Sequence, residues 1–334
     1  MKRITVIGAG SWGTALAKVL GDKGYPVTLW DRDADRLAEL GRARENAKYL
    51  PGASLPEAIS VEPDLVRAVE GAPVVVSVVP SHAVRDVFGR AGRAMEADAI
   101  VVSASKGIEN DTLETMDEVL KEVLPGPIGA RLAFLSGPSF AKEVGAGLPT
   151  AVVMASRERE VAERAATLFR TERFRIYTSD DVPGVELGGA LKNVMAIAAG
   201  VADGMGLGHN SRAALITRGL AEITRLAVRR AANPLTLAGL AGLGDLVLTC
   251  TGDLSRNRSV GVGLGQGRTL AEVLGGMSQV AEGVKTTKSA YDLAARLGVE
   301  MPITTAIYRI LYEDVPAGEA IAELLMRAPK HELA

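Results

Sequence analysis

The sequence predicts an α/β protein in which residues 1–180 form a doubly wound sheet domain and residues 181–334 form an all-helical domain. Up to about residue 180, short runs of β-branched residues alternate with helical patterns. Such alternation is typical of a parallel sheet with right-handed crossovers and helices on both faces. Beyond that point the β-branched runs thin out and apolar residues recur at helical spacing. At 334 residues, two domains are expected on length alone.

The expected strands are short apolar runs, and Val74-Val75-Val76 has the continuous apolar character of a strand covered on both faces. We expect strands at Ile4–Ile7, Val27–Trp30, Val74–Val79, Ile100–Ser103, Leu132–Leu135, Ala151–Met154 and Phe174–Thr178. We expect the main helices of the second half at Ala190–Val201, Ser211–Ala231, Val284–Leu297 and Pro302–Glu313. Glycines at positions 204, 206 and 208 interrupt the pattern between the first two of these helices.

The composition argues against several classes of protein. The apolar fraction of 47% and charged fraction of 23% are typical of a globular protein, and a net charge of −2 without a basic block disfavours nucleic-acid or anionic-membrane binding. The single cysteine, Cys250, excludes an intramolecular disulfide and is expected to be a packing residue. The histidines His82, His209 and His331 lack metal-ligand spacing, so we expect no metal. We find no signal-peptide pattern and no apolar run approaching membrane-spanning length, so we expect a cytoplasmic protein.

A glycine-rich loop follows the first expected strand. It reads Gly8-Ala9-Gly10-Ser11-Trp12-Gly13 and leads into a helical pattern, which places G-x-G-x-x-G in a strand–turn–helix setting. Gly8 permits the tight turn, Gly10 lets the backbone approach a pyrophosphate, and Gly13 permits close packing of helix on sheet. The free N–H groups of the helix start would hold the diphosphate. The loop therefore predicts a Rossmann-type domain that binds NAD or NADP.

The second expected strand ends at Trp30-Asp31-Arg32, where a Rossmann-type domain meets the adenosine ribose. Asp31 there would bond the 2′-hydroxyl of NAD, whereas Arg32 would accommodate the 2′-phosphate of NADP. A solvated turn is the alternative to both roles. The preference between NAD and NADP stays open at this level.

Polar residues follow two further expected strands. Lys106 comes after Ile100–Ser103, and Gly137 and Ser139 come after Leu132–Leu135. Residues beyond the carboxyl ends of parallel strands line the ligand crevice of such a sheet. A lysine there can meet a nicotinamide and an anionic substrate, and Gly137 and Ser139 can present backbone and hydroxyl groups. The competing interpretations are an exposed loop lysine and an ordinary Gly-Pro-Ser turn.

Two charged residues of the second half are candidates for proton chemistry. Lys192 lies inside the apolar helical segment Ala190–Ile197. Burial would lower the pKa of this lysine toward the range useful for proton transfer, and a neighbouring Lys106 would lower it further. The alternative is a lysine that extends from a helix edge into solvent. Asp245 is expected at a helix start, where its simplest role is an N-cap.

The segment Ser255-Arg256-Asn257-Arg258 places hydroxyl, guanidinium and amide donors close together. Arg256 could hold a phosphate through two parallel hydrogen bonds, and a helix start there would add backbone N–H groups. A solvated basic turn fits the same residues equally well. The segment is therefore a candidate phosphate site on spacing alone.

Together these segments resemble the bacterial NAD(P)-dependent glycerol-3-phosphate dehydrogenases over nearly the whole chain. The most specific are Gly239–Asp245 continuing to Ser255–Arg258, and Ile216–Glu222. The matching stretches are Gly8–Ala17, Lys48–Gly52, Ser105–Gly107, Ser136–Glu143, Leu191–Val194, Gly208–Glu222, Ala238–Arg258 and Val280–Val284. Ala281 departs from the larger aliphatic residue that the family often carries, a difference not expected to change the chemistry.

The resemblance implies a role for each matching residue. Lys192 looks like the general acid/base, Lys106 like a lysine shared by substrate and cofactor, and Asp245 like the carboxylate that orients the site. The implied substrate contacts are Lys106, Gly137, Ser139, Lys192, Asp245, Ser255, Arg256 and Asn257. The implied cofactor contacts, besides Gly8, Gly10 and Gly13, are Ser11, Trp12, Arg32, Tyr49, Lys106, Ala141, Arg256, Val280 and Glu282.

The implied reaction is the interconversion of dihydroxyacetone phosphate and sn-glycerol 3-phosphate with NAD(P)H, supplying glycerol 3-phosphate for phospholipid synthesis. A homodimer is expected from the class of enzyme. The first alternative is another two-domain dehydrogenase acting on a hydroxy acid or a nucleotide sugar. The second is a non-catalytic NAD(P) sensor, which would need the glycine loop but neither Lys192 nor Arg256.

Overall fold

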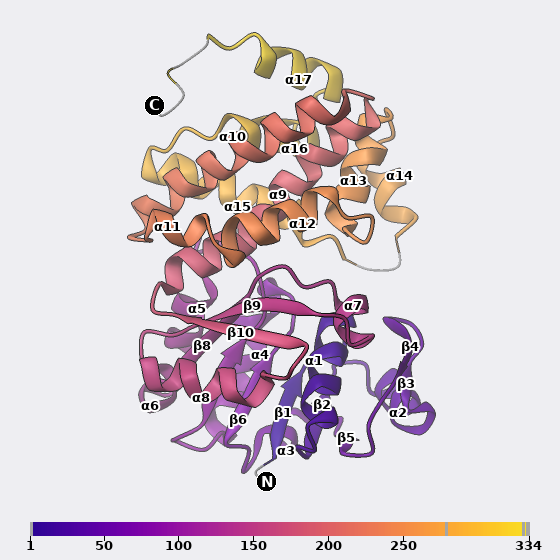
Figure 1. Cartoon of the computed structure of the whole chain (residues 1–334), viewed down its shortest axis with the longest axis vertical. Coiled ribbons are helices and arrows are strands. Elements are labelled where there is room, and N and C mark those ends of the chain that lie inside the picture. The colour runs from indigo at the N-terminus through magenta and orange to yellow at the C-terminus, as the bar shows by residue number, and fades with distance from the viewer. Residues whose placement is uncertain (1–2, 278–279, 329–330, 332–334) are drawn as a thin grey trace.

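The computed structural model describes residues 3–277, 280–328 and 331 of the chain. Figure 1 shows a sheet domain formed by the N-terminal half, with a helical domain above it formed by the C-terminal half. Helix α9 (Val182–Gly204) starts beside the sheet and runs into the middle of the helical domain. The boundary at residues 180/181 stays a prediction.

An eight-stranded sheet runs in the order β10-β9-β8-β7-β6-β1-β2-β5. Its strands are β1 (Ile4–Ile7), β2 (Val27–Trp30), β5 (Ile59–Val61), β6 (Val74–Ser77), β7 (Ile100–Ser103), β8 (Leu132–Ser136), β9 (Thr150–Ala155) and β10 (Phe174–Ser179). All neighbouring strands are parallel except β8 and β9. The expected Rossmann-type α/β fold is confirmed, with all seven expected strands present.

Three details of the sheet domain differ from expectation. Strand β6 ends at Ser77 rather than Val79, because the chain turns before Pro80, which has no N–H to continue a ladder. Strand β9 is antiparallel to β8, because the connection between them holds only the five-residue helix α7 (Ala141–Gly145) and returns at the same end of the sheet. The short strand β5 and the hairpin of β3 (Glu45–Asn46) with β4 (Leu50–Ser54) carry no apolar run long enough to predict.

Helices cover both faces of the sheet. Apolar side chains of α1, α2 and α8 pack on one face, and those of α3, α4 and α5 pack on the other. The two layers explain the fully buried strands, as in Val74–Ser77. The helices of this domain are α1 (Ser11–Asp22), α2 (Ala34–Ala43), α3 (Leu65–Val69), η1 (Ser81–Ala83), α4 (Val84–Ala91), η2 (Gly92–Ala94), α5 (Met116–Val123), α6 (Gly126–Gly129), α7 and α8 (Arg159–Phe169).

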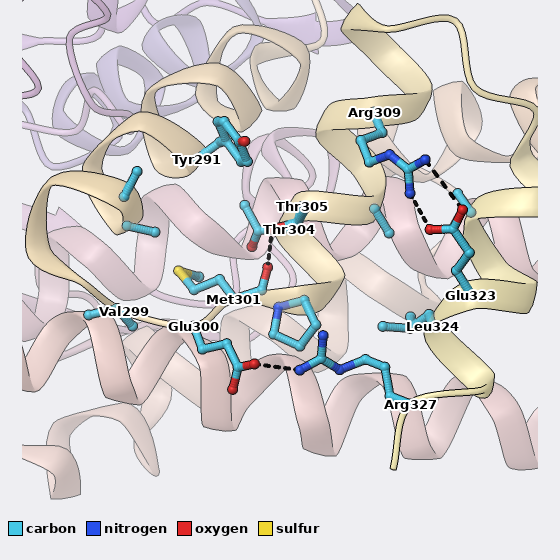
Figure 2. A pocket seen from close by; sticks show the side chains of 15 residues that line it. Tyr291, Val299, Glu300, Met301, Thr304, Thr305, Arg309, Glu323, Leu324 and Arg327 are labelled. Atoms are coloured by element: carbon cyan, nitrogen blue, oxygen red, sulfur yellow. Dashed lines mark hydrogen bonds and ion pairs between the residues drawn. The ribbon is translucent and has the colours of Figure 1, made fainter.

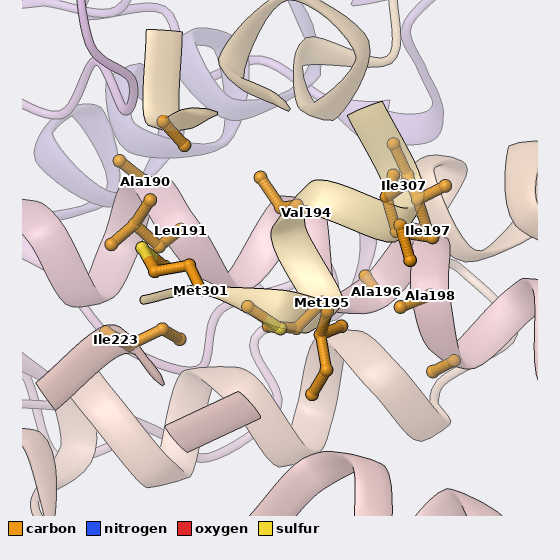
Figure 3. Packing of buried hydrophobic residues seen from close by; sticks show 14 of the residues in the cluster. Ala190, Leu191, Val194, Met195, Ala196, Ile197, Ala198, Ile223, Met301 and Ile307 are labelled. Atoms are coloured by element: carbon orange, nitrogen blue, oxygen red, sulfur yellow. The ribbon is translucent and has the colours of Figure 1, made fainter. Parts of the chain in front are cut away.

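Helix α9 is the centre of the helical domain. Its residues from Leu187 to Ala202 are all buried, which is the pattern of a helix surrounded by others. Figure 3 shows buried side chains of α9, among them Val194 and Met195, in one apolar cluster with Ile223 of α10 and Ile307 of α16. The other elements are α10 (Gly208–Arg229), α11 (Pro234–Leu237), the π-helical turn η3 (Leu240–Gly244), α12 (Asp245–Thr251), α13 (Arg256–Gly265), α14 (Leu270–Gly275), α15 (Glu282–Leu297), α16 (Pro302–Tyr312) and α17 (Ala317–Leu325).

Glycines on two helices bring α9 and α13 into close contact. A Cβ at Gly200 would overlap the carbonyl oxygen of Arg258, and a Cβ at Gly261 would overlap the carbonyl oxygen of Ile197. Only a residue without a side chain allows backbones to approach this closely. The start of α13 therefore lies beside the middle of α9, which carries Lys192.

Candidate active site

The glycine loop has the geometry of a diphosphate cradle. Gly8 has φ +112° at the turn, and a Cβ at Gly13 would overlap the carbonyl oxygen of Gly8, so helix α1 packs directly against the loop. A Cβ at Gly10 would meet no atom within 4 Å, so this side of the loop is open to an incoming group. The buried indole N–H of Trp12 has no hydrogen-bond partner among the described residues. These features fit a bound dinucleotide.

The carboxylate of Asp31 is engaged by neighbouring groups of the protein. Its Oδ2 accepts a hydrogen bond from the N–H of Ala9 at 2.8 Å. Its Oδ1 accepts from the N–H of Asp33 at 3.1 Å and pairs with Arg36 at 2.5 Å. Both carboxylate oxygens are thus engaged, whereas the adjacent Arg32 is exposed. The sequence left the role of Asp31 open, and in the structure both of its carboxylate oxygens bond groups of the protein.

Lys106 is fixed above the carboxyl end of β7. The neighbouring Ser105 hydroxyl donates to the carbonyl of Val79 at 2.6 Å and bonds the Ser77 hydroxyl at 3.0 Å, which holds the loop against β6. The Lys106 ammonium lies 3.4 Å from the carbonyl oxygen of Gly137, beyond β8. These loops therefore meet at the carboxyl edge of the sheet, as expected for an α/β crevice.

Lys106 and Lys192 share the carboxylate of Asp245. Lys106 Nζ lies 2.7 Å from Oδ2 of Asp245, and Lys192 Nζ donates to its Oδ1. Asp245 and Lys192 are buried, and Asp245 is the first residue of α12, directly after the π-helical turn. The Thr249 hydroxyl donates to the backbone carbonyl of Asp245 at 2.6 Å. Asp245 is thus an ion-pair partner of two lysines and not a simple N-cap, and Lys192 does not extend into solvent.

The shared carboxylate sets the charge state of the cluster. Burial lowers the pKa of Lys192 to about 8; Asp245 opposes this effect and Lys106 adds to it. Burial favours the neutral form of Asp245, but the two lysines outweigh it and hold the pKa of this carboxyl below its usual range. A lysine with a pKa about 8 exists in both charge states near neutral pH, which suits a group that donates and accepts protons.

The start of α13 places polar groups beside Lys192. The Ser255 hydroxyl caps the helix by accepting from the N–H of Arg258 at 3.3 Å. The Asn257 amide donates to the Oδ1 of Asn193 at 2.9 Å, and its oxygen accepts from the N–H of Gly283 at 2.9 Å. Asn257 therefore ties the starts of α13 and α15 to the residue that follows Lys192.

Arg256 and Arg258, two residues apart, have different surroundings. Arg256 is exposed and donates to the carbonyl oxygen of Val280 at 2.8 Å, which leaves most of its guanidinium available. Arg258 pairs with Asp203 at 2.8 Å and with Asp253 at 3.0 Å, so its charge is already compensated within the protein. Arg256 is the arginine of this segment that can receive an anion.

The other expected site residues lie at helix starts and in loops. Ser11 starts α1 and Ala141 starts α7. Glu282 starts α15; burial raises the pKa of its carboxyl, against the opposing charges of Arg256, Lys106 and Lys192. Ser139 donates to the carbonyl of Gly137 at 2.9 Å. Tyr49 stacks under the guanidinium of Arg36, 4.7 Å from the ring centre, and this arginine also donates to the carbonyl of Ala9 in the glycine loop.

Three side chains beside the cluster were not predicted as site residues from the sequence. Asn193 follows Lys192 in the sequence and accepts a hydrogen bond from the amide of Asn257. Thr249 lies one helical turn after Asp245 and donates to the backbone carbonyl of Asp245. The buried Ser136 hydroxyl has no partner among the described residues, and it lies against Gly189, whose position also faces Lys106. No sequence pattern distinguishes these residues from ordinary helix and turn residues.

A separate hollow in the helical domain does not overlap this site. It has a volume of about 360 Å³ and lies between α15, α16 and α17. Figure 2 shows its charged side chains already matched, Arg309 with Glu323 and Arg327 with Glu300. It contains none of the expected site residues.

Among the described residues, two helical stretches are long and apolar enough to cross a membrane by length and composition alone, so the expectation that no run approaches this length does not hold on that criterion. The stretch Val182–Gly204 is α9, and 94% of its apolar 18-residue segment is buried inside the protein. The other, Pro234–Thr251, consists of α11, η3 and α12 and holds Asp245.

Burial of Cys250 raises the pKa of its thiol to about 12, as for a packing residue. Within the described part of the chain, no group of His, Cys, Asp and Glu residues is placed to hold a metal ion.

Comparison with known proteins connects this geometry to a family. Residues 3–162 match the family model described as the N-terminus of NAD-dependent glycerol-3-phosphate dehydrogenase, and residues 181–322 match the model of its C-terminus. A glycerol-3-phosphate dehydrogenase [NAD(P)+] of Anaeromyxobacter dehalogenans is 58% identical over 331 residues, which are 99% of this chain and 100% of that protein.

Two solved structures are similar along the whole chain. The glycerol-3-phosphate dehydrogenase of Coxiella burnetii is 42% identical with a TM-score of 0.94, covering 98% of this chain and 99% of that one. The Saccharomyces cerevisiae enzyme is 26% identical with a TM-score of 0.81, covering 98% and 99% of the two chains. The resemblance found in the sequence is therefore confirmed: the chain belongs to the NAD-dependent glycerol-3-phosphate dehydrogenase family.

Proposed function

We propose that this chain interconverts dihydroxyacetone phosphate and sn-glycerol 3-phosphate with NAD(P)H, that Lys192 transfers the proton, and that Asp245 and Lys106 orient the reacting groups. The observation that carries this proposal is the convergence of two lysines, one from each half of the chain, on a single buried carboxylate. The cluster lies at the carboxyl edge of a sheet whose first loop fits a dinucleotide.

Lys192 is the proton donor and acceptor in this proposal. In the direction of reduction its ammonium gives a proton to the C2 oxygen, and in the direction of oxidation its neutral amine takes that proton back. A bound nicotinamide cofactor supplies or receives the hydride. The pKa of Lys192 of about 8 supports both directions, because neither charge state is inaccessible near neutral pH.

Lys106 and Asp245 orient the reacting groups. Asp245 accepts hydrogen bonds from both ammonium groups, and Lys106 thereby lies beside the carbonyl of Gly137, in the loop that carries Ser139. A substrate placed there can receive hydrogen bonds from Lys106 and the Ser139 hydroxyl. Holding a substrate against a positioned donor lowers the entropic part of the barrier.

The start of α13 holds the substrate phosphate in this proposal. Ser255, Arg256 and Asn257 lie at the N-terminus of a ten-residue helix, where free N–H groups and the helix dipole favour an anion. Arg256 adds the charge, and Asn257 is fixed by two hydrogen bonds at 2.9 Å. The phosphate then acts as a handle that fixes C2 near Lys192.

The cofactor would lie across the glycine loop. Gly8, Gly10 and Gly13 shape the loop, and Ser11 and Trp12 begin the helix beneath the diphosphate. Arg32 would contact the adenosine end of the cofactor, and Tyr49 and Ala141 would lie at the rim of the cofactor site. The nicotinamide end would contact Lys106, Arg256, Val280 and Glu282. We further propose a cytoplasmic homodimer that supplies glycerol 3-phosphate for phospholipid synthesis.

A turnover assay tests the proposal. Dihydroxyacetone phosphate is offered with NADH and with NADPH, and 2-keto acids are offered in parallel as substrates of related two-domain dehydrogenases. We expect turnover with dihydroxyacetone phosphate and its loss in Lys106→Ala, whereas Lys288→Ala, a lysine paired with Asp292 away from the site, keeps wild-type rates. Cofactor binding without turnover of any substrate would instead indicate a sensor.

A further inference from the structure

Three basic side chains lie near one another at the rim of the cofactor crevice. Arg32 follows β2, His82 follows β6 in the turn η1, and Lys285 lies in the first turns of α15. All three are exposed. Neither Arg32 nor Lys285 forms an ion pair with any residue in the described ranges 3–277, 280–328 and 331. The first two belong to the sheet domain and the third to the helical domain.

Contacts beside His82 place it next to the start of α15. The backbone N–H of the preceding residue, Ser81, interacts with the carboxylate of Glu282 on the first turn of that helix. A Cβ at Gly107 would collide with the Ser81 hydroxyl and would lie 3.8 Å from the hydroxyl of Thr286. The turn that carries His82 therefore faces the segment that carries Lys285.

The ends of β2 and β6 meet at the glycine loop. The N–H of Gly8 donates to the carbonyl of Trp30 at 2.8 Å, two residues before Arg32. A Cβ at Gly8 would lie 2.8 Å from the carbonyl oxygen of Val78, four residues before His82. Arg32 and His82 thus follow two strands that flank β1, on the side where the adenosine ribose of a dinucleotide lies.

The local charges favour an anion at this place. Burial, Lys285 and Arg32, in that order, lower the pKa of His82, so both cations lie close enough to His82 to act on it as like charges. The acidic residue that usually reads a free 2′-hydroxyl, Asp31, has both oxygens engaged by Ala9, Asp33 and Arg36. Positive groups placed this close to one another are stabilised when a phosphate binds between them.

We propose that Arg32, His82 and Lys285 form one composite site for the 2′-phosphate of NADP, with His82 and Lys285 adding to the selectivity of Arg32. Because Lys285 comes from the helical domain, the phosphate joins the two halves of the crevice. The inference rests on the proposed function, since it concerns the cofactor of the same site. It answers the question that Asp31 and Arg32 left open: the chain prefers NADPH to NADH.

The test measures dissociation constants for NADPH and NADH by cofactor fluorescence in wild type, Arg32→Ala, His82→Ala and Lys285→Ala. We expect each variant to weaken NADPH by about 5- to 20-fold, the range for a partly exposed charge-assisted contact, and to change NADH by less than about 2-fold. Lys288→Ala is the matched control, since this lysine lies on the same helix but already pairs with Asp292. Adenosine 2′,5′-bisphosphate should compete better than 5′-AMP, and this difference should shrink in all three variants.

Each other outcome has a distinct meaning. Equal weakening of NADPH and NADH in Lys285→Ala overturns the proposal, because the lysine would then contact the diphosphate or support the fold. A selectivity loss confined to Arg32→Ala also overturns it, because no composite site would exist. Failure of wild type to bind either cofactor would contradict the proposed function itself.

Discussion

Replacing Asp245 with asparagine should shift the pH profile of the reaction to lower pH. The substitution keeps the shape of the side chain but removes the negative charge that Lys106 and Lys192 share. Asp245 raises the pKa of Lys192, so its loss lowers that pKa further from the value of about 8. Oxidation of glycerol 3-phosphate requires neutral Lys192, so the acidic limb of its profile should move in the acidic direction.

The size of the shift follows from the geometry. An opposite charge within hydrogen-bonding reach shifts a pKa by ~1–3 units. Removing it therefore lowers the pKa of Lys192 by ~1–3 units, on the order of a few kcal/mol in the free energy of protonation. Reduction of dihydroxyacetone phosphate needs the ammonium form, so in the variant this direction should lose rate near neutral pH.

The assay is kcat/KM for glycerol 3-phosphate oxidation at saturating cofactor across the range from about pH 5.5 to about 10, since kcat/KM reports the groups of the enzyme before substrate binds. Asp117→Asn is the matched control. Asp117 is also a buried carboxylate paired with two cations, Lys121 and Arg157, both at 2.9 Å, but it lies outside the crevice. Its profile should keep the wild-type acidic limb.

An acidic limb of Asp245→Asn that stays within about 0.3 pH units of wild type, or moves to higher pH, would contradict this prediction. Either result would mean that Lys192 is not the titrating group or that Asp245 does not control it. A parallel shift in Asp117→Asn would attribute the change to general loss of stability.

Variants at four further positions test the rest of the site. Lys192→Ala should lower kcat by ~100-fold or more with cofactor Kd nearly unchanged, and near-normal turnover would remove this lysine from the mechanism. Arg256→Ala should raise KM and lower kcat for dihydroxyacetone phosphate, and Arg256→Lys should restore little of this activity. An equal loss of turnover with dihydroxyacetone, which lacks the phosphate, would argue against a phosphate contact. Gly10→Ala should keep the Tm and weaken the binding of both cofactors, because a Cβ at this position meets no protein atom. Gly13→Ala should lower the Tm, because a Cβ there overlaps the carbonyl oxygen of Gly8. The reverse pattern in thermal melts would contradict the loop assignment.

Much of the fold could be predicted because its signals are local. The run Val74–Val76 is buried on both faces, and the glycine loop adopts the strand–turn–helix form that its spacing predicts. The direction of β9 could not be predicted, since an apolar run has the same pattern whichever way the strand points. Only the length and path of the connection after β8 determine it.

The sequence by itself determined which residues are available and which family they match, because that information lies in short, specific runs such as Ser255–Arg258. The tertiary structure decided what those residues do. Lys106 and Lys192 stand 139 and 53 positions from Asp245, and only folding brings them to one carboxylate. The lowered pKa of Lys192 arises from burial and from these neighbours, and the orientation of Asp31 arises from Ala9 and Arg36. Charge state and side-chain direction depend on three-dimensional surroundings, which no spacing along the chain contains.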